Sequence, residues 1–293
     1  MSQTTVLFDA PGPRGRRNTL IANLIATLIA AAIIVWVLIQ LHGRGQLEPR
    51  MWIAALEWSA WRDYLLPGLQ FTLQAAGISV VTAIVFGLVF GFLRLAPFRV
   101  IRYASSVVVE FLRAVPVLVM MVFLYTFFAK FVSPAGFFPA QDAPYYAVIV
   151  GLTLYNGSVI AELVRSGVFG LPNGQREAAA AVGMTRNQSL LLVEVPQALT
   201  AMLPSLLSQV VIILKDSALG YLIGFYELLQ YSRQLGSAQG NMLQALVVAA
   251  LIFIVINTVL TLIARALASR LSSHTSGTTT PAAGPAGWSA AKL

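Results

Sequence analysis

The sequence predicts an all-α protein, a polytopic transmembrane bundle of about six helices. Two observations predict this fold class. Of the 293 residues, 58% are hydrophobic and only 10% are charged, whereas a soluble domain carries about 25% charged residues. The apolar residues also gather in runs close to the roughly 20 residues that a helix needs to cross the hydrocarbon of a bilayer. A chain with so little polar surface cannot cover itself in water.

The first apolar run covers residues 20–41 and follows a basic segment. Three arginines lie just before it: Arg14, Arg16 and Arg17. A cleavable signal peptide is the alternative, but its apolar region has about 7–15 residues and ends at a site of small residues. This run is longer, and no such site follows it at residues 42–44. We therefore expect a cytoplasmic segment over residues 1–19 and an extra N-terminal transmembrane helix over 20–41.

Five further apolar runs complete the expected bundle. They cover residues 65–93, 106–129, 145–164, 190–214 and 243–264. Gly87 and Gly91 form a GxxxG pattern that allows another helix to approach closely. Pro196 and Pro204 interrupt the fourth of these runs, which is tolerated where neighbouring helices satisfy the freed carbonyl groups. Residues 272–293 are rich in Ser, Thr, Gly, Pro and Ala, a composition that predicts a disordered cytoplasmic tail.

Basic residues predict the orientation of the bundle, because cytoplasmic loops of membrane proteins carry an excess of Lys and Arg. With the N-terminus inside, twelve Lys and Arg residues fall in cytoplasmic segments and six in outer segments. Both termini are then expected in the cytoplasm, and the chain is expected to be a multi-pass membrane protein in contact with lipid. The net charge of +8 forms no basic stripe interleaved with aromatics, so no nucleic-acid partner is expected.

Metal, cofactor and covalent chemistry have few candidate residues. The sequence has no cysteine and two histidines. These histidines, His42 and His274, are isolated, whereas a metal site needs several converging ligands. An intramembrane enzyme needs a nucleophile–base set or metal ligands at depth, so we expect no catalytic residue, metal or cofactor. The sequence also lacks the G-x-x-x-x-G-K-[ST] loop that cradles the phosphates of ATP.

Residues 170–204 are too polar to be buried in lipid and are expected on the cytoplasmic face; we call this stretch the elbow. Asn173 can cap a short helix over residues 175–182, and Gly183 can end that helix in a left-handed conformation. Thr185 and Gln188 form a capping-box pattern that starts another helix. Alanines give the first helix a smooth surface that suits a partner's groove. An ordinary amphipathic surface loop is the alternative.

A spaced motif in the elbow carries a family resemblance. It begins with Glu177-Ala178-Ala179, and Gly183 follows after three intervening residues. Val193 follows after nine more, and Val195-Pro196 after one more. This motif resembles the EAA loop of bacterial ABC importer permeases, in which the two valine positions are isoleucine and leucine. The resemblance implies that the elbow docks on a separate ATPase subunit, and that this chain is a transport subunit and not an enzyme. The residues that it assigns to coupling are Glu177, Ala178, Ala179, Gly183 and Pro196.

Other stretches resemble the polar amino acid branch of that family. They are residues 111–119 (similar to FRGTPLLVQ), 161–167 (AEIVRGG), 171–175 (IPKGQ), 196–199 (PQAL) and 214–219 (LKDTSL). Ala114, Val115 and Ala218 depart from these patterns. The resemblance implies a permease domain over 65–268, with a five-span core that leaves the first helix outside. It also implies ATPase subunits, a periplasmic or lipoprotein solute-binding protein, a second permease subunit and a polar amino acid substrate of the glutamate, glutamine, histidine or arginine class.

Charged residues inside the spans usually pair or line a wet path, because a charge at mid-bilayer costs about 2.5–3.5 kcal/mol. Glu110 and Arg113 are three residues apart on one helical face, and so are Glu162 and Arg165. Each couple is expected to pair internally. A position on a water-lined path is the alternative for both.

Four residues are candidates for the substrate pathway: Asn156, Lys215, Asp216 and Ser217. A zwitterionic substrate needs one acceptor and one donor, which Asp216 and Lys215 supply near the outer end of their span. A structural ion pair between these two residues is the alternative. Asn156 and Gly157 are expected to break their span at mid-depth and expose backbone groups to the path, with a packing contact around the small residue as the alternative.

Two other functions are weighed against an importer permease for amino acids. An ion-coupled secondary transporter would have internal repeats with paired broken helices, and no repeat is evident in the sequence. Within the ABC interpretation, a permease for another small solute is the nearer alternative.

Overall fold

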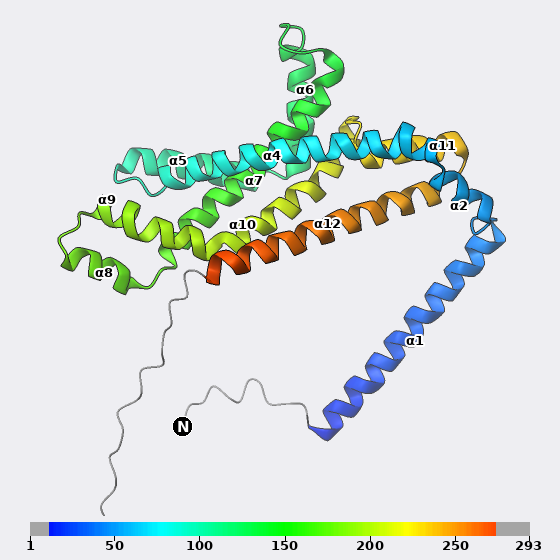
Figure 1. Cartoon of the computed structure of the whole chain (residues 1–293), viewed down its shortest axis with the longest axis horizontal. Coiled ribbons are helices and arrows are strands. Elements are labelled where there is room, and N and C mark those ends of the chain that lie inside the picture. The colour runs from blue at the N-terminus through cyan, green and yellow to red at the C-terminus, as the bar shows by residue number, and fades with distance from the viewer. Residues whose placement is uncertain (1–11, 274–293) are drawn as a thin grey trace, which may run out of the picture.

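The structure is a computed structural model that describes residues 12–273, and all the regular structure within this range is helical. The helix α1 (Pro13–Gly43) contains the N-terminal helix expected over 20–41 and begins seven residues earlier. Pro13 suits its first turn, where no helical partner is needed for the missing N–H. No residue of α1 is buried, and the helix extends away from the rest of the chain, joined to it near α2 (Figure 1).

The second span is a long helical segment, Trp58–Leu93. It follows α2 (Pro49–Leu56) and combines α3 (Trp58–Ala60), the π-helical turn Trp61–Leu65 and α4 (Leu66–Leu93). The close approach predicted from Gly87 and Gly91 is found, because α4 packs along α7 (Ala143–Phe169). A Cβ atom at Gly91 would lie 2.7 Å from the Cβ of Val164, and one at Gly87 would overlap Ile160.

The prediction of a single helix over residues 106–129 is wrong. The structure has two helices there, α5 (Arg99–Ala114) and α6 (Val117–Phe127), and the axes of the two segments differ by 99°. Pro116 causes the break, because it has no N–H to donate and its ring disfavours a helical residue before it. Val115 accordingly has extended backbone angles, φ −82° and ψ 123°. The helix α6, continued by the π-helical turn Phe128–Val132, projects from the side of the bundle (Figure 1).

The break predicted at Asn156 and Gly157 is also wrong, because α7 runs through both residues without interruption. The side-chain amide of Asn156 donates to the carbonyl of Leu152 at 3.2 Å, within the same helix. A Cβ atom at Gly157 would lie 2.7 Å from the ring of Phe86 on α4. The alternative interpretation, a packing contact around a small residue, therefore describes this position.

The remaining helices form the C-terminal half of the bundle. The candidate span Arg186–Ile223 is longer than the predicted run at 190–214. Its parts are α9 (Arg186–Ser189), the π-helical turn Leu190–Glu194, α10 (Val195–Ser217) and the 3-10 turn Ala218–Ile223. The elbow helix α8 (Asn173–Ala181) precedes it, and α11 (Leu228–Gln239) and α12 (Met242–Ser273) follow. Within residues 12–273, five helices are long and apolar enough to cross a membrane, or six if the bent pair is one span, which agrees with the expected number.

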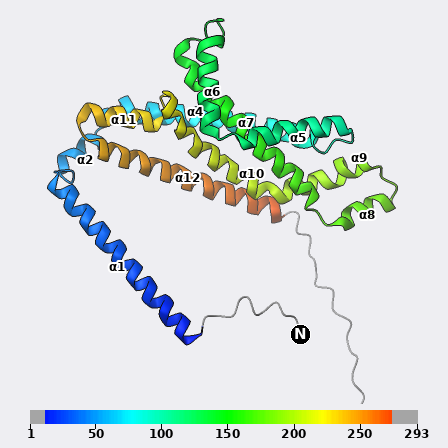
Figure 2. The same ribbon diagram turned by 180° about the vertical axis from the view of Figure 1, so that it is seen from behind.

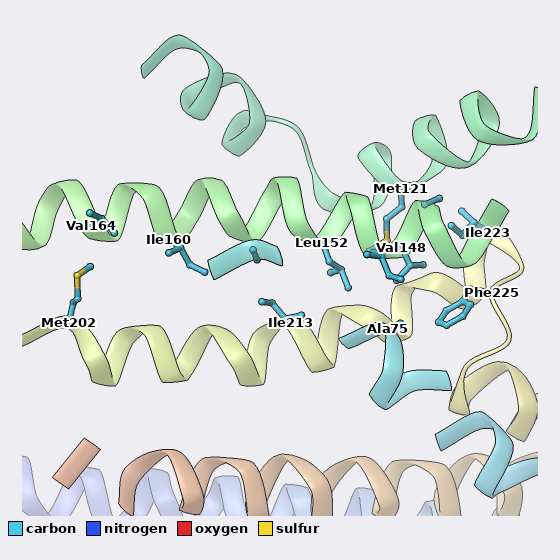
Figure 3. Packing of buried hydrophobic residues seen from close by; sticks show 13 residues of the cluster. Ala75, Met121, Val148, Leu152, Ile160, Val164, Met202, Ile213, Ile223 and Phe225 are labelled. Carbon is cyan, nitrogen blue, oxygen red and sulfur yellow. The ribbon is translucent and has the colours of Figure 1, made fainter. Parts of the chain in front are cut away.

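The main core is formed by apolar side chains of α4, α6, α7 and α10, together with Ile223 and Phe225. Among its residues, Met121, Leu152, Ile160 and Ile213 are buried. Figure 3 shows Ile223 and Phe225 at one end of this cluster, close to Val148 and Met121, and Met202 at the other end. The large apolar side chains left exposed lie mainly on α1, α4, α5, α6 and α12, as expected for a lipid-facing surface.

The two ends of the bundle differ. The helices α8 and α9 lie at one end, and α2 and α11 lie at the opposite end (Figures 1 and 2). Part of the predicted N-terminal segment, residues 1–11, lies outside the described residues. The predicted tail also lies outside them, except for residues 272 and 273, which are the last two of α12.

Candidate coupling site

The elbow is a helix, a corner and a second helix, as predicted, and most residues of the first helix, α8, are exposed. Ala179 is buried, whereas Glu177 and Ala178 are exposed. No hydrogen bond or ion pair joins the Glu177 carboxylate to the described residues 12–273. The carboxylate is therefore available to a group from another molecule.

Gly183 forms the corner of the elbow. Its φ of 81° lies in the left-handed region, which costs a residue with a Cβ atom roughly 1–2 kcal/mol. The N–H of Gly183 donates to Ala180 O at 3.0 Å, and the N–H of Met184 donates to Ala179 O at 3.1 Å. These two bonds satisfy carbonyl groups that the end of α8 would otherwise leave free. The predicted helix stop at Gly183 is confirmed.

The start of the second elbow helix is also confirmed. The Thr185 hydroxyl accepts a hydrogen bond from the Gln188 N–H, and the Gln188 side chain accepts one from the Thr185 N–H, which is a capping box. The predicted cap at Asn173 is wrong. Asn173 is already the first residue of α8, and Pro172 precedes it without a side-chain cap. Pro172 fixes the backbone entry to α8, so the helix starts two residues earlier than predicted.

Glu194 holds the elbow together. It lies in the π-helical turn Leu190–Glu194 and is only 1% exposed. Its carboxylate accepts hydrogen bonds from the guanidinium groups of Arg186 on α9 and of Arg176 on α8, the latter at 3.3 Å. The Ser189 hydroxyl donates to it at 2.8 Å. One buried carboxylate therefore connects α8 and α9 to the start of α10.

A second contact ties the same parts. The Gln197 side chain on α10 donates to the Gln175 side chain on α8 at 3.1 Å. Pro196, next to Gln197, is exposed and lies in the first turn of α10. A proline there closes no helical hydrogen bond of its own, and it follows directly after the π-helical turn that presents Glu194 inward.

Sequence reasoning missed the role of Glu194. The motif position between the two valines accepts any residue, so the motif carried no signal for it. A carboxylate within an apolar run, with Arg176 and Arg186 nearby in sequence, was the available signal. Their meeting depends on the π-helical turn, which sequence patterns do not predict.

A charge network joins α4, α5 and α7 near their ends. Arg94 is 5% exposed, and its guanidinium donates to Glu162 at 2.7 Å and to Glu110 at 2.9 Å. The predicted internal pairs are also present: Arg165 lies 2.6 Å from Glu162 and Arg113 lies 3.4 Å from Glu110. Arg94 is one of the twelve basic residues that the charge distribution assigns to cytoplasmic segments, and in the structure it is buried and shared by the two carboxylates.

The candidate pathway residues do not form one site. Ser217 is buried and its hydroxyl donates to Leu214 O at 2.7 Å, within its own helix. Lys215 is exposed and borders a cavity with α12, whereas Asp216 is half-buried. The alternative ion pair between Lys215 and Asp216 is not found in the described residues. Asn156 is buried on α7, and its Oδ1 atom has no partner there.

A helical bundle in which five of the described helices are long and apolar enough to cross a bilayer defines an integral membrane protein. The family comparison agrees with this class. Residues 83–273 match the family model described as "Binding-protein-dependent transport system inner membrane component". The match covers more than half of the sequence, and the chain belongs to this family. It is thus a multi-pass transport component of the inner membrane.

Individual relatives are consistent with this assignment. The chain is 46% identical to the glutamate transport system permease protein GluD of Corynebacterium glutamicum over 217 residues, 74% of this chain and 78% of that protein. It is 34% identical to the probable glutamine ABC transporter permease protein GlnP of Bacillus subtilis over 197 residues, 66% of this chain and 87% of that protein.

A solved structure supports the fold. The chain is similar to the crystal structure of an amino acid ABC transporter with histidines, with a TM-score of 0.65 and 24% identity. The match covers 72% of this chain and 95% of the solved one. The all-α bundle of about six spans predicted from the sequence is therefore confirmed.

Proposed function

We propose that this chain is the permease subunit of an ATP-driven importer for a polar amino acid. The family assignment supports an importer component, and the names of the two relatives support a substrate of the glutamate or glutamine class. ATP would be hydrolysed on separate ATPase subunits, and a second permease subunit would complete the pore. A periplasmic or lipoprotein solute-binding protein would deliver the amino acid to the end opposite the elbow. No cofactor or metal is proposed.

The observation that carries the coupling part of the proposal is the construction of the elbow. Glu177 and Ala178 are exposed at its surface, Gly183 sets its corner, and buried Glu194 fixes α8 to the base of α10. The helix α10 continues into the core beside α7. A push on α8 by an ATPase would therefore pass into the bundle instead of bending a loose loop. We assign Glu177, Ala178, Ala179, Gly183 and Pro196 to this contact.

The orientation and the substrate path belong to the same proposal. With the elbow on the ATPase side, both termini are cytoplasmic, as the distribution of basic residues indicates. Residues 65–268 form the permease domain, and the helix at 20–41 is additional to it. Lys215, Asp216, Ser217 and Asn156 are retained as candidate pathway residues. The unpartnered Oδ1 of Asn156 supports this role, because a buried acceptor without a donor is costly unless water or solute reaches it.

Substitution at Gly183 tests the coupling assignment. Gly183→Asp forces a residue with a Cβ atom into the left-handed region and should abolish ATP-driven uptake while ATP hydrolysis by the assembled transporter continues. Gly136→Asp is the matched control, because Gly136 also has a positive φ, 84°, and open space around it, but lies outside the elbow. Normal uptake by the Gly183→Asp transporter would disprove the coupling role.

A further inference from the structure

A cavity of about 550 Å³ lies at the end of the bundle opposite the elbow. It is bounded by the N-terminal part of α4, by the 3-10 turn Ala140–Asp142 and the start of α7, and by residues 224–226 and α11. Its volume falls within the roughly 300–1,000 Å³ typical of small-molecule sites. With the elbow facing the cytoplasm, this cavity opens on the outer side of the membrane.

Aromatic rings form most of the cavity wall. The rings that line it are Phe71, Tyr145, Tyr146, Phe225, Tyr226 and Tyr231. They support one another: Phe71 and Tyr231 are stacked with ring centroids 6.4 Å apart, and Tyr226 lies 5.8 Å from Tyr231. The face of an aromatic ring attracts a cation. The wall is thus suited to an ammonium group and holds its shape without a ligand.

Three polar side chains complete the cavity: Gln74, Gln141 and Asp142. Asp142 precedes α7, but its carboxylate caps none of the N–H groups of that helix. None of the three side chains has a hydrogen bond or ion pair to another group within residues 12–273. One carboxylate and two amides are therefore free to meet a ligand that carries both a positive and a negative group.

The floor of the cavity is closed. Phe225 is 4% exposed and belongs both to the cavity wall and to the main hydrophobic cluster. Figure 3 shows its ring at the end of that cluster, beyond Val148. A solute in the cavity would therefore stop directly above the packed core, at a place from which opening of the bundle could admit it.

We propose that this cavity binds a free amino acid, with the ammonium group held by Asp142 and the ring faces of Tyr226 and Tyr231, and the carboxylate held by the amides of Gln74 and Gln141. The proposal deepens the proposed function, on which its substrate class rests. Among the residues that the structure describes, no cationic side chain lines the cavity, so the ammonium group is the part of the solute that the cavity recognises most strongly. The cavity is a first outer binding site, separate from the candidates on α10.

Equilibrium binding tests the proposal. The full chain, purified with its partner subunits in lipid nanodiscs and without the binding protein, is titrated with labelled L-glutamate and L-glutamine. Both should bind, and glutarate, which differs from glutamate only in lacking the ammonium group, should not compete. Asp142→Asn should weaken binding about tenfold or more, because a charge-assisted hydrogen bond is lost. Tyr226→Leu should weaken it and Tyr226→Phe should not, since the phenyl ring keeps its face.

A matched control and a second assay separate the possible failures. Asp63→Asn removes an exposed carboxylate that pairs with Arg62 and does not line the cavity, and it should leave binding unchanged. The cavity site would be overturned by absence of binding, by competition from glutarate, or by equal affinities in Asp142→Asn and Asp63→Asn. The aromatic rings would then be only a membrane-interface belt. Uptake is measured after the same purified transporters are reconstituted into proteoliposomes, with ATP and the binding protein supplied. Binding that depends on Asp142 without any ATP-driven uptake would disprove the importer and leave the cavity site intact.

Discussion

Glu194 offers the sharpest test of how the elbow is held. Glu194→Gln keeps the shape of the side chain but removes the charge that faces Arg176 and Arg186. Loss of a buried ion pair costs up to about 3–5 kcal/mol when the partner charge is left buried. The side chains of Arg176 and Arg186 are 39% and 51% exposed, so water can solvate them after the substitution. Each charge-assisted hydrogen bond is worth about 1.5–3 kcal/mol, and we therefore expect a loss of about 2 kcal/mol, confined to the elbow.

Hydrogen exchange of the α8 amides measures this loss locally. Those amides should exchange about 30-fold faster in Glu194→Gln, which is 2 kcal/mol converted to a ratio, while the amides of α7 keep the wild-type rate. Glu48→Gln is the control, because the Glu48–Arg50 pair is exposed and such pairs contribute little. Wild-type exchange in α8 of Glu194→Gln would refute the reasoning that this carboxylate fixes the elbow.

Three further predictions concern stability. Arg94→Gln removes the buried cation that Glu110 and Glu162 share, although each carboxylate keeps a second arginine partner. The free energy of unfolding should therefore fall by about 2 kcal/mol, the loss of charge-assisted hydrogen bonds. A loss no larger than that of Arg113→Gln, which is more exposed, would contradict this. Gly91→Leu should lower the free energy of unfolding by about 1–3 kcal/mol through overpacking against Val164. Gly77→Leu is the control, because open space surrounds Gly77, and it should leave thermal unfolding unchanged. Burial raises the pKa of Glu227, outside the spans, from 4.5 to about 7. The folded chain then holds this proton more tightly than the unfolded chain, so stability should fall by about 3 kcal/mol as the pH rises from 4.5 to 7, and Glu227→Gln should flatten that slope.

The parts of the structure set by local chemistry could be predicted from the sequence. Gly183 and the Thr185–Gln188 box act within a few residues of themselves, so their patterns identified the corner and the second elbow helix. The apolar runs identified the spans for the same reason, since a helix satisfies the hydrogen bonds of its own backbone groups and can therefore lie in lipid. The spacing of Gly87 and Gly91 predicted a close contact, although not its partner on α7.

The parts that depend on distant contacts or on competing local signals were missed. The hydropathy of the run at 106–129 predicts one helix, but Pro116 breaks it, because the steric effect of the proline ring outweighs the apolar composition. Asn156 and Gly157 stay helical because α4 packs against them, which the sequence of one helix cannot reveal. Arg94 is buried because two carboxylates from α5 and α7 converge on it. Glu194 meets Arg176 only because the π-helical turn directs it inward.

Transport into proteoliposomes tests the central claim most directly. The chain is co-purified with its ATPase subunits, reconstituted, and assayed with a panel of labelled amino acids in the presence and absence of ATP and the binding protein. We predict uptake of one polar amino acid that requires both ATP and the binding protein. Uptake driven by an ion gradient without ATP would contradict the account, and the elbow would then be a surface loop.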